Sequence, residues 1–169
     1  MSSRVIIFDT SVLCCLLQVP GKQTAGPLHD RWDHGRISSL IETELSLNST
    51  FVLPLASIIE TGNHVAQAPG DRFTIAQGLA KVISEAATAS SPWAAFTDQA
   101  ELWREEQLTG LAKTWPELAK GGISIGEATI KEVADYYARA GFDVEIVTGD
   151  AGLKAYEPKA TVRVPRRRR

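Results

Sequence analysis

The sequence predicts an α/β domain, in which parallel strands form a sheet with helices on both of its faces. Apolar runs of strand length occur at residues 5–8, 51–56 and 143–148, and the first of them is rich in β-branched side chains. Segments with apolar residues at helical spacings of three and four separate these runs. Strands that alternate with helices along a chain are typical of a parallel sheet.

The length and composition predict one globular domain. A chain of 169 residues, with 44% hydrophobic and 22% charged residues, can bury a sizeable core, and we place the domain at residues 1–165 with a helical middle at about 70–120. The formal net charge of −2 gives no global basic field for nucleic acid. Residues 166–169 are all arginine, a tail that is either a solvated terminus or a weak contact for a phosphate backbone.

The cysteines and the apolar runs predict a cytoplasmic protein. Cys14 and Cys15 are adjacent and are the only cysteines, so the chain has neither a disulfide framework nor a cysteine-based zinc site. We identify no signal peptide and no apolar run of transmembrane length, and we therefore expect no membrane partner.

The individual elements follow from caps and breakers. The strand at 51–56 should end near Pro54 or Leu55, because proline donates no hydrogen bond to a ladder. Ser57 is the expected N-cap of the next helix, with Glu60 at capping-box spacing. Gly141 is the expected C-terminal glycine of the long helix that precedes the strand at 143–148. The other expected helices cover 30–47, 58–67, 72–89, 96–118, 128–140 and 151–156, and a last strand is expected at 161–164.

An acid follows each of the three apolar runs. Asp9 ends the first, Glu60 lies just inside the helix after the second, and Asp150 follows the strand at 143–148, while Glu127 opens the helix before it. In a parallel sheet these acids would meet at the carboxyl edge, where ligands of open α/β folds bind. Neighbouring carboxylates repel one another unless a cation lies between them, and their hard oxygens suit Mg²⁺ or Mn²⁺. Two such ions can stabilise the attacking and leaving oxygens of a phosphodiester displacement.

Four segments resemble the acidic motifs of PIN domains in order and spacing. They are Ile6–Leu13 around Asp9, Ile58–Thr61 around Glu60, Ser124–Ile130 around Glu127 and Val147–Asp150. This resemblance implies a three-layer α/β/α sandwich around a parallel sheet of about five strands. It also implies an endoribonuclease that depends on Mg²⁺ or Mn²⁺, with Asp9, Glu60, Glu127 and Asp150 as catalytic metal ligands.

The resemblance further implies partners. PIN proteins include toxins of type II toxin–antitoxin pairs, of the VapC kind, so an RNA substrate, an antitoxin protein and a homodimer are the expected partners. Two features depart from the pattern: the third acid is Glu127 where aspartate is common, and the middle segment is longer than in the small toxins. A PIN-like module that binds protein or RNA without catalysis is therefore the alternative function.

Each candidate residue also has a structural interpretation. Asp9 and Asp150 could serve as helix N-caps, Glu60 could complete the capping box with Ser57, and Glu127 could be a first-turn acid favoured by the helix dipole. Hydroxyl side chains beside these acids are expected to orient the carboxylates by hydrogen bonds, with ordinary turn hydrogen bonds as the alternative. These hydroxyl residues are Thr10, Ser11 and Thr148.

The remaining candidates concern RNA contacts. Basic side chains could contact RNA phosphates or simply be solvated, and tryptophans could stack on bases or pack in the core. The basic candidates are Lys22, Arg31, Arg36 and Lys154, and the tryptophans are Trp32, Trp93, Trp103 and Trp115.

Overall fold

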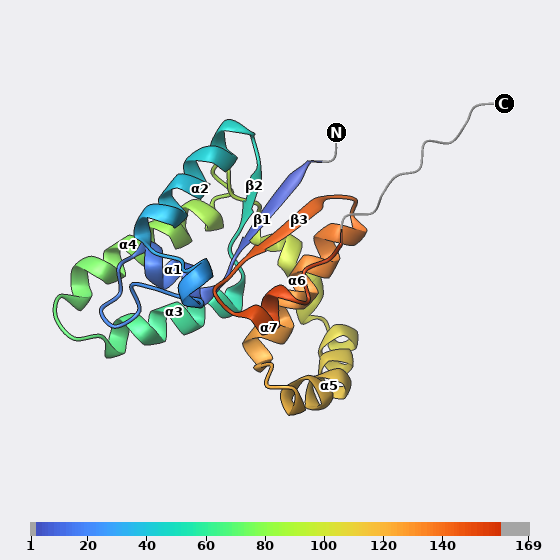
Figure 1. Ribbon diagram of the computed structural model, residues 1–169. Coiled ribbons are helices and arrows are strands. Elements are labelled where there is room, and N and C mark those ends of the chain that lie inside the picture. Colours follow the sequence, from blue (N-terminus) through green and yellow to red (C-terminus); the bar gives the residue numbers. More distant parts are fainter. Residues whose placement is uncertain (1–2, 160–169) are drawn as a thin grey trace.

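A computed structural model describes residues 3–159 of the chain and confirms the α/β class. Three parallel strands, β1 (Arg4–Phe8), β2 (Thr50–Val52) and β3 (Asp143–Val147), form a sheet in the order β2-β1-β3. Figure 1 shows β1 in the middle of this sheet. Residues 3–159 therefore hold a sheet of three strands where about five were expected, and the strand expected at 161–164 lies outside the described residues.

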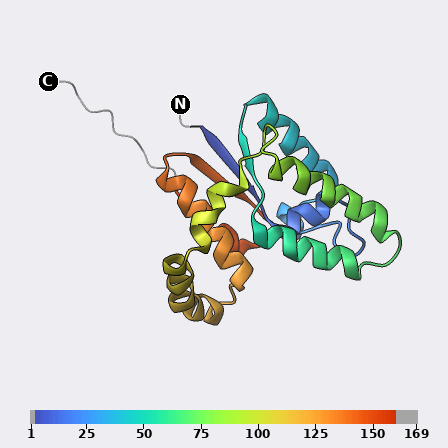
Figure 2. The ribbon, with the colours of Figure 1, turned by 180° about the vertical axis from the view of Figure 1, so that it is seen from behind.

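Strand β1 is buried on both faces, which explains its continuous apolar sequence. Ile6 and Phe8 belong to one buried cluster, whereas Val5 and Ile7 point to the other. The first cluster is covered by α1 (Thr10–Leu16), α2 (His34–Ser46) and α4 (Arg72–Ala87). The second is covered by α6 (Ile125–Arg139) and by the short α7 (Ala151–Lys154). Figures 1 and 2 show these two groups of helices on opposite sides of the sheet.

Helix α3 starts earlier than the sequence predicted, and the capping box expected for it is wrong. It spans Leu55–Gln67, and its N-cap is Pro54, which is extended (φ −63°, ψ 143°). Ser57 is inside the helix and fully buried, and its Oγ donates a hydrogen bond of 2.8 Å to the carbonyl of Phe8. The hydroxyl therefore joins α3 to the end of β1. Because Ser57 is not the N-cap of α3, Glu60 does not complete a capping box with it.

The middle of the chain is helical, but it contains a break that the sequence did not predict. A 3-10 helix, η2 (Phe96–Trp103), is followed by α5 (Glu105–Lys120), and Arg104 between them is extended (φ −72°, ψ 156°). Glu105 and Glu106 lie in the first turn of α5, where acids are favoured by the helix dipole. Pro116 lies inside α5 and does not end it. Within residues 3–159 no helix is both long and apolar enough to cross a membrane.

Two other helix starts are set by side-chain caps. Asp33 accepts a hydrogen bond of 2.8 Å from the backbone N–H of Arg36, so α2 begins at His34 instead of near residue 30. Ser124 caps α6, which therefore begins at Ile125, three residues before the predicted start. A single-turn 3-10 helix, η1 (Leu28–Asp30), occupies the loop between α1 and α2.

Candidate functional site

The four predicted acids line one cleft at the carboxyl edge of the sheet. Asp9 follows β1, Asp150 follows β3 and caps α7, Glu60 lies in the second turn of α3, and Glu127 lies in the first turn of α6. The cleft that they share has a volume of about 430 Å³. Four elements that are distant in sequence thus bring their carboxylates to one place, as the parallel arrangement requires.

Asp9 is buried and held by its neighbours. Its Oδ2 accepts hydrogen bonds from Ser11 Oγ at 2.7 Å and from Thr148 Oγ1 at 2.8 Å, in addition to the capping bond from the Ser11 N–H at 3.4 Å. Both hydroxyls accept a hydrogen bond in turn, since Gly149 N donates to Ser11 Oγ and Asp150 N donates to Thr148 Oγ1, each at 2.9 Å. Asp9 is therefore a helix cap and also an oriented carboxylate in the cleft.

Glu60 reaches the cleft because a glycine opposite leaves room for it. Thr10 Oγ1 donates to Glu60 Oε2 at 3.2 Å, so Thr10 also contacts a carboxylate of the site. The other oxygen, Oε1, packs against the first turn of α6 at Gly126. A Cβ atom at Gly126 would lie only 2.1 Å from Glu60 Oε1. The short sequence that opens α6 thus decides where the Glu60 carboxylate can lie.

Glu127 and Asp150 are both engaged by helix ends. Glu127 Oε2 accepts from the N–H of Ser124 at 2.7 Å, while Ser124 Oγ accepts from the N–H of Glu127 at 3.1 Å, which completes a capping box. Asp150 Oδ1 accepts from the N–H of Leu153 at 2.8 Å. Each acid therefore already stabilises a helix start.

The donor set suits a hard cation, although the side chains are not gathered around one point. One oxygen of each acid accepts no hydrogen bond from residues 3–159: Asp9 Oδ1, Glu60 Oε1, Glu127 Oε1 and Asp150 Oδ2. Carboxylate oxygens are the ligands that Mg²⁺ and Mn²⁺ prefer. In the described part of the chain, however, no group of three or more His, Cys, Asp or Glu side chains is arranged to hold a metal ion. Cation binding here requires the acids to draw closer, and Glu127 is restrained by its capping box.

Other residues complete the wall of the cleft. His64 lies one turn after Glu60, and Lys22 and Thr24 come from the loop after α1. Cys14 also lines the cleft, but burial raises the pKa of its thiol to about 11, so the sulfur is neutral at pH 7. The ionisable side chains that line the cleft beside this thiol are therefore four acids, one lysine and one histidine.

Trp32 supports the site through packing. It is buried, its Nε1 donates to the carbonyl of Thr148 at 3.1 Å, and the guanidinium of Arg36 lies 3.8 Å from its ring centroid. Trp32 therefore fixes the turn after β3 and has no free face for a base. Trp93 packs against Phe8 and Phe51.

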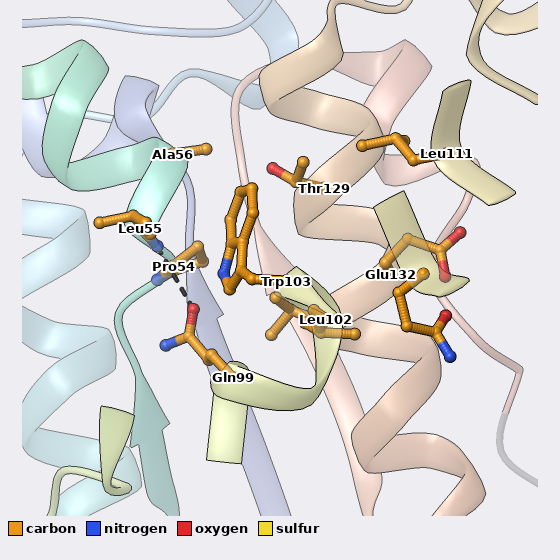
Figure 3. A pocket seen from close by; sticks show the side chains of 11 residues that line it. Pro54, Leu55, Ala56, Gln99, Leu102, Trp103, Leu111, Thr129 and Glu132 are labelled. Atoms are coloured by element: carbon orange, nitrogen blue, oxygen red, sulfur yellow. Dashed lines mark hydrogen bonds between the residues drawn. The ribbon is translucent and has the colours of Figure 1, made fainter. Parts of the chain in front are cut away.

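A second pocket, between α3, η2, α5 and α6, is much smaller than the acidic cleft. Figure 3 shows Trp103 and Leu102 of η2 with Thr129 and Glu132 of α6 opposite them, and Gln99 accepting a hydrogen bond from Leu55 N. Its volume is about 20 Å³, which is room for about one water. The acidic cleft is the better candidate for a substrate site.

Comparisons of the chain with protein-family models, with curated proteins and with solved structures gave no match. The fold and the cleft by themselves define the class: an α/β domain with an acidic cleft at the carboxyl edge of a parallel sheet.

Two features of the cleft were missed in the sequence. Gly126, inside the Ser124–Ile130 motif, gave a usable signal, because a glycine in a helical first turn often marks a close approach. The place of Cys14 in the cleft gave none, since its neighbours are apolar helix residues.

Proposed function

We propose that this protein is an endoribonuclease that depends on Mg²⁺ or Mn²⁺ and hydrolyses RNA phosphodiester bonds. The observation that carries the proposal is the shared cleft of Asp9, Glu60, Glu127 and Asp150. Four carboxylates in one cleft of about 430 Å³ repel one another, and Lys22 is the one lysine or arginine among the described residues that lines the cleft with them.

The residues of the cleft have two roles in this proposal, to bind the cation and to orient the carboxylates that bind it. Asp9, Glu60 and Asp150 would hold the cation through the oxygens that accept no hydrogen bond, and Glu127 would join them by leaving its capping box. When bound, the cation supplies positive charge to the phosphodiester and acidifies a water. Ser11 and Thr148 keep Asp9 in one orientation, because both donate to its Oδ2. Thr10 does the same for Glu60.

The substrate assignment rests on the motif resemblance to PIN domains. Under the same resemblance, the narrower role is that of a toxin in a type II toxin–antitoxin pair. That role predicts a reading frame for a small antitoxin beside the one for this chain, and co-expression of the two proteins should suppress RNA cleavage.

The test compares two aspartates that both cap helices. Asp9→Asn removes a charged ligand but keeps a good capping side chain, and Asp33→Asn makes the same change at the N-cap of α2, which does not line the cleft. We expect Asp9→Asn to lower Mn²⁺-dependent RNA cleavage by at least about 100-fold, because loss of a residue that only hydrogen-bonds a metal ligand already costs about 10- to 100-fold. Asp33→Asn should cleave like the wild type. Equal cleavage by wild type and Asp9→Asn would overturn the mechanism.

The capping box of Glu127 favours a second candidate, a PIN-like module that binds protein or RNA without catalysis. A glutamate that stabilises a helix start has a structural role without any metal. Calorimetric titration with Mn²⁺ separates the two functions. A binding signal that disappears in Asp150→Asn supports the nuclease, whereas the absence of any Mn²⁺ signal in the wild type supports the binding module.

A further inference from the structure

Lys22 is unusual among the basic residues around the acidic cleft. It is the one lysine or arginine among the described residues that line this cleft. Its ammonium forms no ion pair or side-chain hydrogen bond with residues 3–159, although four carboxylates line the same cleft. A groove next to the cleft, lined by Trp32, Thr148 and Asp150 among others, holds two further cations that are already paired. Arg36 pairs with Asp30 at 2.7 Å and Lys154 with Glu157 at 2.6 Å.

The loop that carries Lys22 is anchored at both ends. At its start, Val19 is buried and its N–H donates to the carbonyl of Cys14 at 3.0 Å, and the N–H of Lys22 donates to the carbonyl of Val19 at 2.8 Å. At its end, Ala25 and Trp32 exchange two backbone hydrogen bonds of 3.0 and 2.7 Å. The position of Lys22 on the wall is therefore defined by the fold.

The end of this loop also packs directly on the turn that carries Asp150. A Cβ atom at Gly149 would lie 2.7 Å from both the Cβ of Ala25 and the backbone nitrogen of Gly26. Only a glycine at position 149 lets the loop at Ala25 and Gly26 pack this closely on the turn after β3, at one side of the cleft.

The charges of the side chains that line the cleft indicate how Lys22 could contribute to RNA binding. The four carboxylates alone would repel an RNA phosphate, and a divalent cation bound among them would offset part of their negative charge. Lys22 would add a further positive charge on the wall that faces the incoming strand. A lysine acts as a point charge for phosphate, through any of its three donors.

We propose that Lys22 binds a phosphate of single-stranded RNA at the wall of the acidic cleft. The proposal rests on the endoribonuclease function proposed above, and it names the residue that holds the substrate backbone while the carboxylates hold the cation.

The test uses the full chain with Lys22→Gln, with Lys22→Arg as the charge-conserving variant and Lys113→Gln as the matched control. Lys113 is an exposed lysine of α5 that does not line the cleft. Binding of a fluorescently labelled single-stranded RNA is measured by anisotropy at several salt concentrations, with Ca²⁺ in place of Mg²⁺. Cleavage kinetics with Mn²⁺ are measured separately, and circular dichroism confirms that each variant is folded.

We expect Lys22→Gln to weaken RNA binding by about 5- to 10-fold and to reduce the slope of log Kd against log salt by about 0.7, the value for one phosphate contact on a single strand. KM should rise with little change in kcat, and Lys22→Arg should restore binding. RNA binding by Lys22→Gln that equals that of Lys113→Gln overturns the proposal, even if the wild type cleaves RNA. Weakened binding without any cleavage by the wild type supports the Lys22 contact and overturns the nuclease function instead.

Discussion

A methyl group at position 126 should disable the site without unfolding the protein. In Gly126→Ala the new Cβ would lie 2.1 Å from Glu60 Oε1, and ordinary contact begins at 3.4 Å, so this oxygen must move by about 1.3 Å or more. The atom that must move is the end of a flexible side chain, so the rearrangement is inexpensive. It breaks the hydrogen bond from Thr10 Oγ1 to Glu60, which costs about 1 kcal/mol. Alanine is favoured over glycine in a helix by about 1 kcal/mol, which offsets that loss.

The unfolding free energy should therefore change by less than about 1 kcal/mol, whereas a displacement of this size in a catalytic group can cost about 100-fold in rate. Urea unfolding, Mn²⁺ calorimetry and RNA cleavage measure the three quantities. Gly110→Ala is the matched control, because Gly110 lies in α5 and a Cβ there meets nothing within 4 Å. It should gain up to about 1 kcal/mol of stability with unchanged Mn²⁺ affinity. Wild-type cleavage and Mn²⁺ affinity in Gly126→Ala would refute the placement of Glu60 as a ligand.

Two further predictions concern stability. Burial raises the pKa of the Cys14 thiol from its ordinary 9.0 to about 11, so the folded state holds this proton more tightly than the unfolded state. This contribution to the unfolding free energy is complete below pH 9 and is lost as the pH rises to 11, by about 2 to 3 kcal/mol. Urea unfolding measured against pH should show this fall in the wild type and a smaller fall in Cys14→Ala. Equal falls in the two proteins would contradict the prediction. Ser57→Ala removes the buried bond to the Phe8 carbonyl and should lower the unfolding free energy by about 1 to 3 kcal/mol, whereas Ser39→Ala, on the exposed surface of α2, should change it by less than about 0.5 kcal/mol.

Local sequence predicted the elements best where caps and periodicity agreed. The run that ends in Phe8 became the central strand, and Asp9 capped the helix after it, because both features depend on adjacent residues. Gly141 follows α6 with φ +94°, as the glycine expected just after a helix.

Local sequence failed where a distant contact overrode a local one. Ser57 has the spacing of a capping box with Glu60, but its hydroxyl bonds to Phe8, which is 49 residues earlier in the chain. The hydrogen bond to a buried strand end replaces the local cap, and α3 starts at Leu55 instead. The break at Arg104 is of the same kind, since α5 packs against η2 and α6 and takes a new direction there.

The sequence by itself determined which residues carry acids at strand and helix ends, because those positions depend only on local pattern. The order of strands and helices also predicted that the four acids meet at one edge of the sheet, which the shared cleft confirms. The tertiary structure alone decided that Gly126 makes room for Glu60 and that the loop after α1 presents Lys22 beside the acids. The physical reason is that parallel strands align their carboxyl ends through hydrogen bonds between distant segments, here Phe8 with Val147 and Ile7 with Val52. No local pattern specifies which side chains those pairings bring into contact.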